Sequence, residues 1–263
     1  MNPLHTIGIL LRDETQPFPL EQMQIIFDRM GVKMFVLNHD RPDHPLDLVI
    51  AMGGDGTVLR ALDEFPDQPV LAVNFGLVGF LTAGDRSDLE KLLFRVLAGD
   101  YLVSERLILS CSYPGGKAHA VNEMVIKSGS RMIMVDVWVN GAKIRTIRGD
   151  GVILGTPTGS TGYLLSTGSP VVMPDVNCFV LDGINEYNFS SRPLILSPET
   201  QVRFYLHPPV APQDVRFIID GKPVAMLTGG NEILCKRSHR RARLIFFEEN
   251  YFFHNLSSRL SWN

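Results

Sequence analysis

The stretch Leu48-Val49-Ile50-Ala51-Met52-Gly53-Gly54-Asp55-Gly56-Thr57 joins an apolar run to a turn with three glycines and one carboxylate. The apolar run predicts a buried strand, and the residues from Thr57 to Phe65 predict a helix. Glycines let a ligand approach closely, so backbone N–H groups at such a helix start can face phosphate oxygens. Neither the Gly-Lys-Ser/Thr of a Walker A loop nor Gly-x-Gly-x-x-Gly is present here. The lone aspartate therefore suggests chemistry on a phosphate.

On both sides of this stretch, strand and helix signals alternate over the first hundred residues. Alternation of this kind predicts a parallel sheet in an α/β domain. The predicted strands are Ile7–Leu11, Lys33–Leu37, Leu46–Met52 and Val70–Val73. The predicted helices are a segment from Leu20 that Gly31 ends, Thr57–Phe65, and Asp85–Ala98.

After Gly99 the pattern changes to strands separated by turns, which predicts a mostly antiparallel, all-β second domain. Asn140-Gly141 and Asp220-Gly221 are hairpin signals within it, and a short helical insert is predicted near Ser160–Thr167. The predicted strands are Leu107–Ser112, Val121–Lys127, Met132–Val139, Lys143–Ile147, Cys178–Leu181, Gln201–Leu206, Val215–Ile219 and Glu232–Cys235.

The end of the chain, with a strand at Arg243–Phe247 and a helix at Tyr251–Leu260, is expected to return to the first domain. We therefore predict an α/β domain formed by residues 1–99 and 244–263, and a β-rich domain formed by residues 100–243.

Composition points to an ordinary soluble globular protein. The chain has 263 residues, of which 45% are hydrophobic and 20% charged, and its net charge of -3 disfavours nucleic acid or an anionic membrane as the main partner. Cys111, Cys178 and Cys235 lie far apart, as expected for reduced thiols that fill the core. No signal peptide and no apolar run of membrane-spanning length are found. We expect a cytoplasmic protein.

Three further segments are candidates for a ligand site. Arg148–Tyr163 combines hydroxyls, glycines and one aspartate, and its Thr158 or Ser160 is expected to cap a short helix and expose N–H donors. Asn74–Thr82 follows a predicted parallel strand, at the edge where ligands of open α/β sheets bind. Asn122-Glu123 is a polar pair in an apolar strand. Each has a simpler structural explanation, as has Asp55 itself, whose Asp-Gly can merely form a turn.

Other chemistries find no support. The histidines are scattered without His-Glu-x-x-His spacing, which disfavours a dedicated zinc site, and no Gly-x-Ser-x-Gly hydrolase motif occurs. The basic run Lys236–Arg243 lies between two predicted strands and is expected to be the solvated tip of a hairpin rather than a nucleic-acid site.

Taken together, the motifs resemble those of the NAD kinase family, in its bacterial type, from about Ile50 to Pro193. The matching segments, whose order and spacing are much more specific than any one of them, are Gly53–Thr57, Asn74-Phe75-Gly76 with Gly79–Thr82, Asn122-Glu123, and Gly149-Asp150-Gly151 with Thr156–Thr161. Members of this family phosphorylate the 2′-hydroxyl of the adenosine ribose of NAD to make NADP.

The resemblance implies ATP with Mg²⁺ as phosphoryl donor, with polyphosphate as a further donor in some bacterial members. It also implies a homodimer or homotetramer in which NAD lies near the subunit interface. The fold that it implies is an α/β domain followed by a β-rich domain, with the chain end returning to the first.

Carried over position by position, the resemblance makes Asp55 the catalytic residue, which accepts the proton of the attacking hydroxyl and contacts NAD. The other residues assigned to NAD are Gly56, Arg60, Phe75, Asn122, Glu123, Arg148, Asp150, Thr158, Thr161, Gly162, Tyr163, Leu164, Leu165 and Ser166. Those assigned to the phosphates of ATP are Gly53, Gly54, Gly56, Thr57 and Arg60. No metal-binding side chain is assigned, because Mg²⁺ is expected on the ATP phosphates.

The chain departs from the family pattern at Gly162, where alanine is usual, at Lys222, where glutamine is expected, and over Asp182–Asn188.

Two alternative functions remain open. A kinase of lipids or other small alcohols shares the Gly-Gly-Asp-Gly turn, and a catalytically silent sensor of NAD or NADP would bind without phosphorylating.

Overall fold

The strand β3 (Leu48–Gly53) lies in the middle of a seven-stranded sheet, and every one of its residues is buried. The computed structural model describes residues 3–13, 17–76, 79–188, 191–210 and 214–260. The chain divides into two compact units, Met1–Glu105 with Ala242–Asn263, and Arg106–Arg241. The end of the chain thus belongs to the first unit, as predicted.

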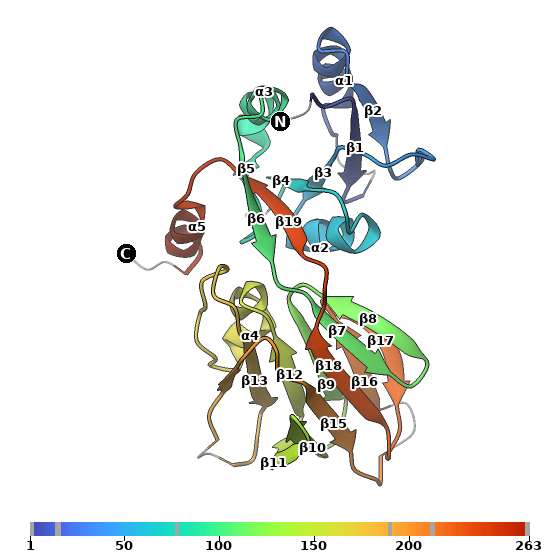
Figure 1. Cartoon of the computed structure of the whole chain (residues 1–263), viewed down its shortest axis with the longest axis vertical. Coiled ribbons are helices and arrows are strands. Elements are labelled where there is room, and N and C mark those ends of the chain that lie inside the picture. Colours follow the sequence, from blue (N-terminus) through green and yellow to red (C-terminus); the bar gives the residue numbers. More distant parts are fainter. Residues whose placement is uncertain (1–2, 14–16, 77–78, 189–190, 211–213, 261–263) are drawn as a thin grey trace. The chain divides into compact units, whose positions relative to one another are not determined.

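The first unit is the predicted α/β domain (Figure 1). Its strands lie in the order β2-β1-β3-β4-β19-β6, with β5 also paired to β4. The pairs among β1 to β5 and between β4 and β19 are parallel. The strands are β1 (Thr6–Leu11), β2 (Lys33–Val36), β3, β4 (Val70–Asn74), β5 (Gly84–Asp85), β6 (Leu102–Arg106) and β19 (Ala242–Phe246).

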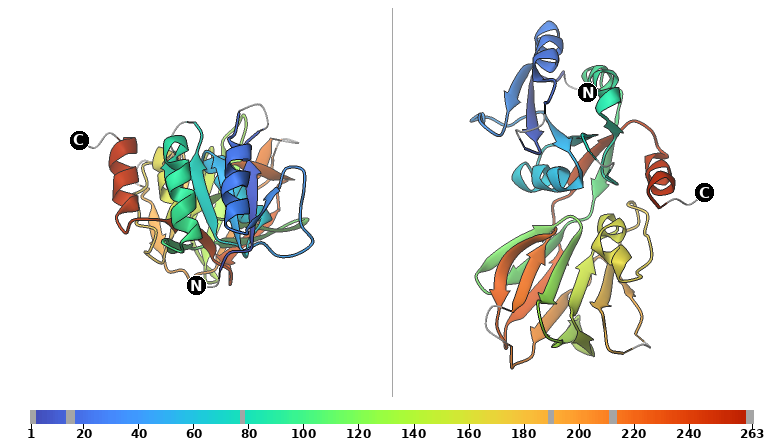
Figure 2. Two further views of the ribbon diagram at one scale, coloured as in Figure 1. Left: turned by 90° about the horizontal axis from the view of Figure 1, so that it is seen from above. Right: turned by 180° about the vertical axis from the view of Figure 1, so that it is seen from behind.

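Helices cover both faces of this sheet. The helices are α1 (Leu20–Arg29), α2 (Asp55–Glu64), the short 3₁₀ turn η1 (Arg86–Asp88), α3 (Leu89–Leu97) and α5 (Tyr251–Leu260). Apolar residues of α1 and α3 pack with those of the strands in one core, and the two helices lie side by side on that face (Figure 2). Helix α2 lies on the opposite face (Figure 1).

The second unit consists of two antiparallel six-stranded sheets, ordered β11-β10-β15-β18-β7-β8 and β14-β13-β12-β9-β16-β17. Apolar side chains of both sheets form a single core between them. The strands are β7 (Leu109–Tyr113), β8 (Gly116–Ala120), β9 (Glu123–Ser128), β10 (Ile133–Val139), β11 (Ala142–Gly149), β12 (Gly151–Gly155), β13 (Phe179–Ile184), β14 (Leu194–Leu196), β15 (Val202–Leu206), β16 (Val215–Ile219), β17 (Lys222–Leu227) and β18 (Glu232–Arg237). A 3₁₀ turn η2 (Thr158–Thr161) and the short helix α4 (Tyr163–Ser166) follow β12.

Both hairpin predictions are confirmed. Asn140 and Gly141 have φ of 48° and 84°, and Asp220 and Gly221 have φ of 47° and 77°. These turns join β10 to β11 and β16 to β17, which pair antiparallel.

Several local predictions were wrong. Lys236–Arg243 is not a hairpin tip, because β18 and β19 belong to different sheets. Helix α2 begins at Asp55 rather than Thr57, with Gly54 as its N-cap. Neither Thr158 nor Ser160 caps α4, whose N-cap is Gly162, and Ser160 instead exchanges hydrogen bonds with Val172.

Candidate functional site

The turn after β3 places the side chain of Asp55 in the first turn of α2, at the positive end of the helix dipole. Its two carboxylate oxygens accept the backbone N–H groups of Phe80 and Leu81, at 2.8 and 3.0 Å. An ionised carboxylate offers about four acceptor positions, so two remain for other donors. The residue is half-buried. Asp55 is thus held in one orientation while it keeps capacity to accept a proton from a ligand.

Gly79 makes this arrangement possible. A Cβ atom at this position would lie 1.7 Å from Oδ1 and 2.4 Å from Cγ of Asp55, far inside van der Waals contact. The carboxylate therefore occupies space that only glycine leaves open. Leu77 and Val78 of the predicted Asn74–Thr82 segment lie outside the described residues.

Beside Asp55, the start of α2 borders a hollow of about 340 Å³. Its lining residues are Arg12, Gly54, Gly56, Thr57 and Arg60. The hollow thus combines two guanidinium groups and a hydroxyl with the positive end of a helix dipole. Such a set is suited to phosphate oxygens. Arg60 is anchored, since its Nη2 donates to the carbonyl of Leu11 at the end of β1. Gly53 packs closely against the side chains of Thr57 and Arg12, two of the residues that line the hollow.

Arg12 was not among the residues predicted from the sequence. It comes directly after β1, which pairs with β3, so both strands end at the same edge of the sheet. In the sequence, Arg12 comes immediately after a predicted strand. A basic residue at the end of a strand beside the glycine turn is a signal for phosphate binding, because ligands of parallel sheets bind at that edge.

Phe75 follows β4 and packs against the core of the first unit. Its ring lies 5.0 Å from that of Phe18, and the guanidinium of Arg86 lies 5.8 Å from its centre.

In the second unit, Asn122 and Glu123 stand where β9 begins. The carboxylate of Asp220 accepts the backbone N–H groups of Val121, Asn122 and Glu123, at 2.9, 2.8 and 3.1 Å. Within the described part of the chain, Oδ1 of Asn122 and Oε2 of Glu123 are buried without a hydrogen-bond partner. Buried polar atoms in a folded protein are normally paired, so these two oxygens are candidates for hydrogen bonds to a ligand.

The carboxyl group of Glu123 is buried beside the Asp220 carboxylate, and both affect its pKa. Burial raises the pKa of Glu123 to about 8, the charge of Asp220 adds to the shift, and the backbone N–H of Tyr163 opposes it. Near neutral pH the carboxyl is therefore mainly protonated and can donate one hydrogen bond as well as accept others.

The segment from Thr156 to Ser166 packs against this pair. A Cβ on Gly159 would lie 2.3 Å from the carbonyl oxygen of Asn122, and one on Gly162 would lie 3.3 Å from Oε2 of Glu123. The hydroxyl of Thr156 donates to the carbonyl of Val121. The structure thus brings Asn122, Glu123 and Gly162 together.

The neighbouring predicted residues differ in their surroundings. Nζ of Lys127 donates to the hydroxyl of Tyr163 at 2.8 Å and lies 5.2 Å from its ring centre. Leu164 is fully buried in a small core, so the structure leaves none of it open to a ligand. Thr158 is also buried and lies 3.4 Å from Nη1 of Arg106. Thr161 and Leu165 are half-buried, and Ser166 is exposed.

Asp150, next to the exposed Arg148, is held by the segment that departs from the family pattern. Nδ2 of Asn185 donates to Oδ2 of Asp150 at 2.7 Å, and Asn185 adopts a left-handed φ of 47°. The backbone N–H of Tyr187 donates to the carbonyl of Arg148 at 2.7 Å. The Asp182–Asn188 segment therefore determines how Asp150 is presented.

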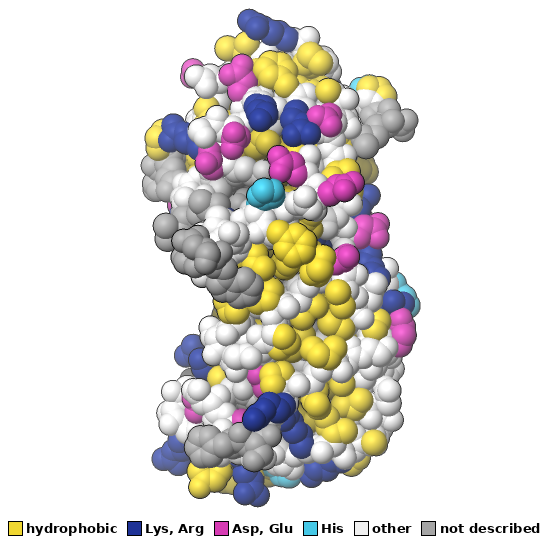
Figure 3. Space-filling view, turned by 90° about the vertical axis from the view of Figure 1, so that its left-hand side faces the viewer, with side chains coloured by type: hydrophobic (Ala, Val, Ile, Leu, Met, Phe, Trp, Pro, Cys, Tyr) yellow, Lys and Arg dark blue, Asp and Glu magenta, His cyan; other side chains and the backbone are white. Residues whose placement is uncertain are grey.

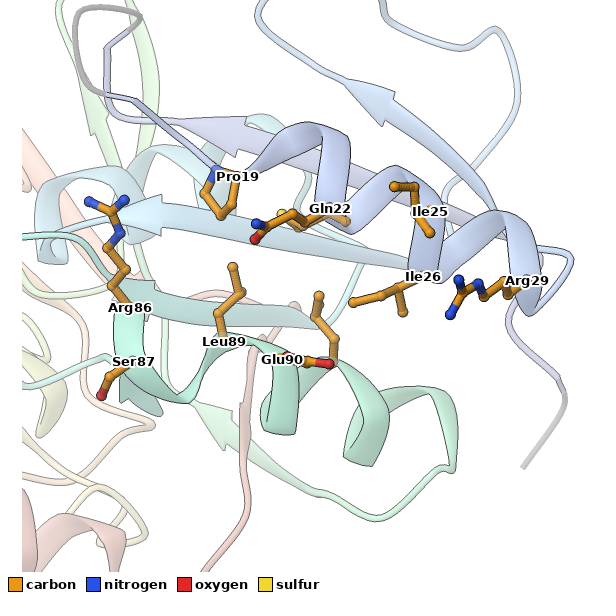
Figure 4. A pocket seen from close by; sticks show the side chains of 11 residues that line it. Pro19, Gln22, Ile25, Ile26, Arg29, Arg86, Ser87, Leu89 and Glu90 are labelled. Carbon is orange, nitrogen blue, oxygen red and sulfur yellow. The ribbon is translucent and has the colours of Figure 1, made fainter.

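A larger hollow of about 460 Å³ lies between α1 and α3, away from these residues. Pro19, Gln22, Ile25 and Ile26 face Leu89 and Glu90 across it (Figure 4). It contains none of the predicted site residues, and its lining mixes apolar side chains with charged and polar ones.

Among the described residues, no three His, Cys, Asp or Glu side chains gather in a way that could hold a metal ion. The same part of the chain contains no helix with the length and hydropathy needed to cross a bilayer.

Comparison with known proteins finds two family models on this chain. The ATP-NAD kinase N-terminal domain matches residues 31–101, and the ATP-NAD kinase C-terminal domain matches residues 121–247. The NAD kinase of Clostridium perfringens is 38% identical over 223 residues, which cover 82% of this chain and 80% of that protein. The NAD kinase of Gemmatimonas aurantiaca is 34% identical over 230 residues, covering 84% and 79%.

Two solved structures are similar over nearly the whole chain. The crystal structure of yeast NADH kinase complexed with NADH matches with a TM-score of 0.87 and 25% identity, covering 100% of this chain and 89% of that one. The crystal structure of an NAD kinase from Archaeoglobus fulgidus in complex with ATP matches with a TM-score of 0.79 and 28% identity, covering 96% and 99%.

Proposed function

The chain belongs to the NAD kinase family, which phosphorylates NAD to NADP, and we propose that Asp55 is the base that accepts the proton of the adenosine-ribose 2′-hydroxyl. The observation that carries this proposal is the Asp55 carboxylate, fixed by two backbone amides beside a hollow lined with phosphate-binding groups. The test is formation of NADP from NAD, ATP and Mg²⁺, and its loss in Asp55→Asn.

Phosphoryl transfer requires little covalent chemistry from a protein. The reacting oxygens must be aligned, the charge on the phosphates must be neutralised, and the nucleophile must lose a proton. Asp55 is the group that accepts this proton. It can do so at the two acceptor positions that the backbone amides of Phe80 and Leu81 leave open. Because its orientation is set before the substrates bind, little is lost in positioning it.

The phosphates of the donor are proposed to bind in the hollow at the start of α2, against Gly53, Gly54, Gly56, Thr57 and Arg60. Arg12 joins this set from the end of β1. Mg²⁺ would arrive on the ATP phosphates and neutralise part of their charge, since the described residues offer no cluster of metal-ligating side chains. ATP is the proposed donor, with polyphosphate as an alternative that uses the same groups.

Arg12→Ala is expected to raise the Michaelis constant for ATP by about 10–100-fold, because a charged hydrogen bond to phosphate contributes roughly 1.5–3 kcal/mol. The Michaelis constant for NAD should change much less. Steady-state kinetics with each substrate varied in turn measures both values. Arg29→Ala, an exposed arginine on α1, is the matched control. An unchanged constant for ATP would remove Arg12 from the donor site.

NAD is proposed to bind with its adenosine end on Asn122 and Glu123, whose buried, unpartnered oxygens it would satisfy. A protonated Glu123 would donate one hydrogen bond to it and Oδ1 of Asn122 would accept another. Phe75 and the segment Thr158–Ser166 are proposed as further contacts, with the ring of Tyr163 as a flat face. Asp150 is proposed to lie near the nicotinamide end, and Arg148 is proposed as a further contact to NAD.

Glu123→Gln is expected to flatten the dependence of stability on pH. The pKa of Glu123 is about 8 in the folded protein, against an ordinary value of 4.5. The folded state therefore holds the proton more tightly, and the wild type loses stability as the pH rises from about 4.5 to 8. Glutamine does not titrate, so the variant should match the wild type near pH 5 and exceed it by of the order of 3 kcal/mol at pH 8.

Chemical denaturation at the two pH values measures this difference. Glu199→Gln, on an exposed glutamate of the same unit, is the control that should show no such pH dependence. In parallel, NAD binding by the wild type should weaken above pH 8, where Glu123 loses its donor, and binding by Glu123→Gln should not. Equal stability of the two proteins at pH 8 would show that Glu123 is not protonated when buried.

The protein is further proposed to be a cytoplasmic homodimer or homotetramer, with NAD near the subunit interface. The family resemblance supports the oligomer, and so does an exposed apolar edge. Strand β14 ends its sheet, and Leu194 and Ile195 on it are 36% and 55% exposed. In Figure 3 hydrophobic side chains, in yellow, also gather on the lower unit. Such patches on soluble proteins usually mark sites of association.

A further inference from the structure

Helix α5 contacts the segment that holds the proposed base. Nδ2 of Asn255 lies 3.2 Å from the carbonyl oxygen of Phe80 and 3.3 Å from that of Thr82. Nη2 of Arg259 donates to the carbonyl of Gly79. The two side chains are one helical turn apart on α5, so a single face of the helix meets the whole segment from Gly79 to Thr82.

The opposite side of this segment meets Asp55. The N–H groups of Phe80 and Leu81 point to the Asp55 carboxylate, while the carbonyls of Gly79, Phe80 and Thr82 accept hydrogen bonds from α5. The segment is thus a single layer of backbone between the helix and the carboxylate. A displacement of the helix would move the two N–H groups.

Further contacts stiffen the layer. The hydroxyl of Thr82 donates to the carbonyl of Gly79 at 3.1 Å, and the guanidinium of Arg259 lies 5.5 Å from the ring centre of Phe80. Burial lowers the pKa of Arg259, whereas the negative charge of Asp55 opposes that shift, which places the cation within electrostatic reach of the carboxylate. The helix therefore contributes both hydrogen bonds and a positive charge near Asp55.

We propose that Asn255 and Arg259 of α5 are positioning residues, which hold Gly79–Thr82 so that its amides orient the carboxylate of Asp55 for proton transfer. This inference rests on the proposed role of Asp55 as base. Helix α5 thereby has a part in the reaction, although Asn255 and Arg259 need not contact either substrate.

Arg259→Gln and Asn255→Ala are each expected to lower kcat by about 10–100-fold, because small misplacements of a catalytic group reduce rates by this order. The Michaelis constants for NAD and ATP should change by less than about threefold, since the helix is proposed to act on the base and not on binding. Arg259→Lys keeps the charge and one donor, and it should retain more activity than Arg259→Gln. His254→Ala changes the neighbouring, 70% exposed side chain of α5 and is the matched control.

The decisive experiment repeats these substitutions in an Asp55→Asn background, with NADP measured by an enzymatic cycling assay. If the helix acts through Asp55, adding Arg259→Gln or Asn255→Ala should lower the residual rate by less than about threefold. Thermal unfolding of every variant shows whether a loss of activity reflects a loss of fold, and Arg259→Lys serves if Arg259→Gln unfolds.

Two results would overturn the inference: unchanged kcat in both single variants, or an equal loss of rate in the two backgrounds. Failure of the proposed function is distinguishable from either. It would appear as full activity of Asp55→Asn alone, before any change is made in α5.

Discussion

Asp55→Asn is expected to lower the turnover of NAD phosphorylation by about 10²–10⁴-fold, the usual contribution of a general base. Asparagine has almost the same size but cannot accept the proton of the 2′-hydroxyl. Affinity for NAD should be largely kept, because Asn122, Glu123 and the Thr158–Ser166 segment lie elsewhere in the chain. Single-turnover measurements of NADP formation, together with NAD titrations, separate the two effects.

The control for this variant is Asp63→Asn, on an exposed aspartate of the same helix. In Asp55→Asn the new amide would also bring an N–H₂ group against one of the two backbone donors at Phe80 and Leu81, so a modest drop in unfolding temperature is expected. Turnover within about threefold of the wild type would show that Asp55 is not the base, whatever the change in stability.

Gly79→Ala is expected to reduce turnover by at least about 10²-fold although the carboxylate remains present. The added Cβ would lie 1.7 Å from Oδ1 of Asp55, so either the side chain or the Gly79–Thr82 segment must move. Overpacking of this kind typically costs about 1–3 kcal/mol of stability. A shift of the reacting group by about 1 Å is enough for the predicted loss of rate.

Kinetics and thermal unfolding of Gly79→Ala check this expectation. Gly116→Ala is the control, because a Cβ there meets nothing closer than the hydroxyl oxygen of Tyr113 at 3.4 Å. A fully active Gly79→Ala enzyme would mean that the carboxylate works in another orientation than the one in the structure.

The two variants examine different parts of one arrangement. Asp55→Asn removes the acceptor and leaves the neighbouring backbone nearly unchanged, whereas Gly79→Ala keeps the acceptor and displaces it. Comparable losses of rate in both would indicate that the identity of the group and its position are both required.

Much of the fold could be predicted because local signals agreed with the final structure. The apolar run that became β3 is buried at every position, and the Asn-Gly and Asp-Gly turns adopt the positive φ that this dipeptide favours. Strands β5, β6, β8, β12, β14 and β17 were not predicted. Strands β6, β8, β14 and β17 lie at edges of their sheets, where many of their side chains face solvent, and β17 also contains Pro223. Strand β5 has only two residues, whereas β12 is central and fully buried and falls within Arg148–Tyr163, which the sequence marked as a candidate ligand segment.

The candidate site, too, could be predicted only in part, where its residues are close together in the sequence. Residues of the glycine turn are neighbours in sequence, so their shared location follows from a strand that ends where a helix begins. Arg259 and Gly79 are 180 residues apart, and the Asp220 carboxylate that holds Glu123 comes from 97 residues further along the chain. No local pattern marks such partners, because only the folded sheet order brings them together.

The chemistry of Glu123 shows the same limit. Its position in a polar pair was recognised, but its raised pKa depends on burial and on Asp220, neither of which a sequence window contains. Similarly, Arg12 joins the phosphate hollow only because β1 and β3 are adjacent in the sheet.

NAD phosphorylation by this protein is tested most directly by incubating the purified protein with NAD, ATP and Mg²⁺ and measuring NADP with an NADP-specific dehydrogenase. The wild type is expected to form NADP steadily, and Asp55→Asn at a rate lower by about 10²–10⁴-fold. Absence of NADP with NAD as acceptor and of NADPH with NADH, whether ATP or polyphosphate is the donor, would contradict this function. It would leave a protein that binds nucleotides without phosphorylating them.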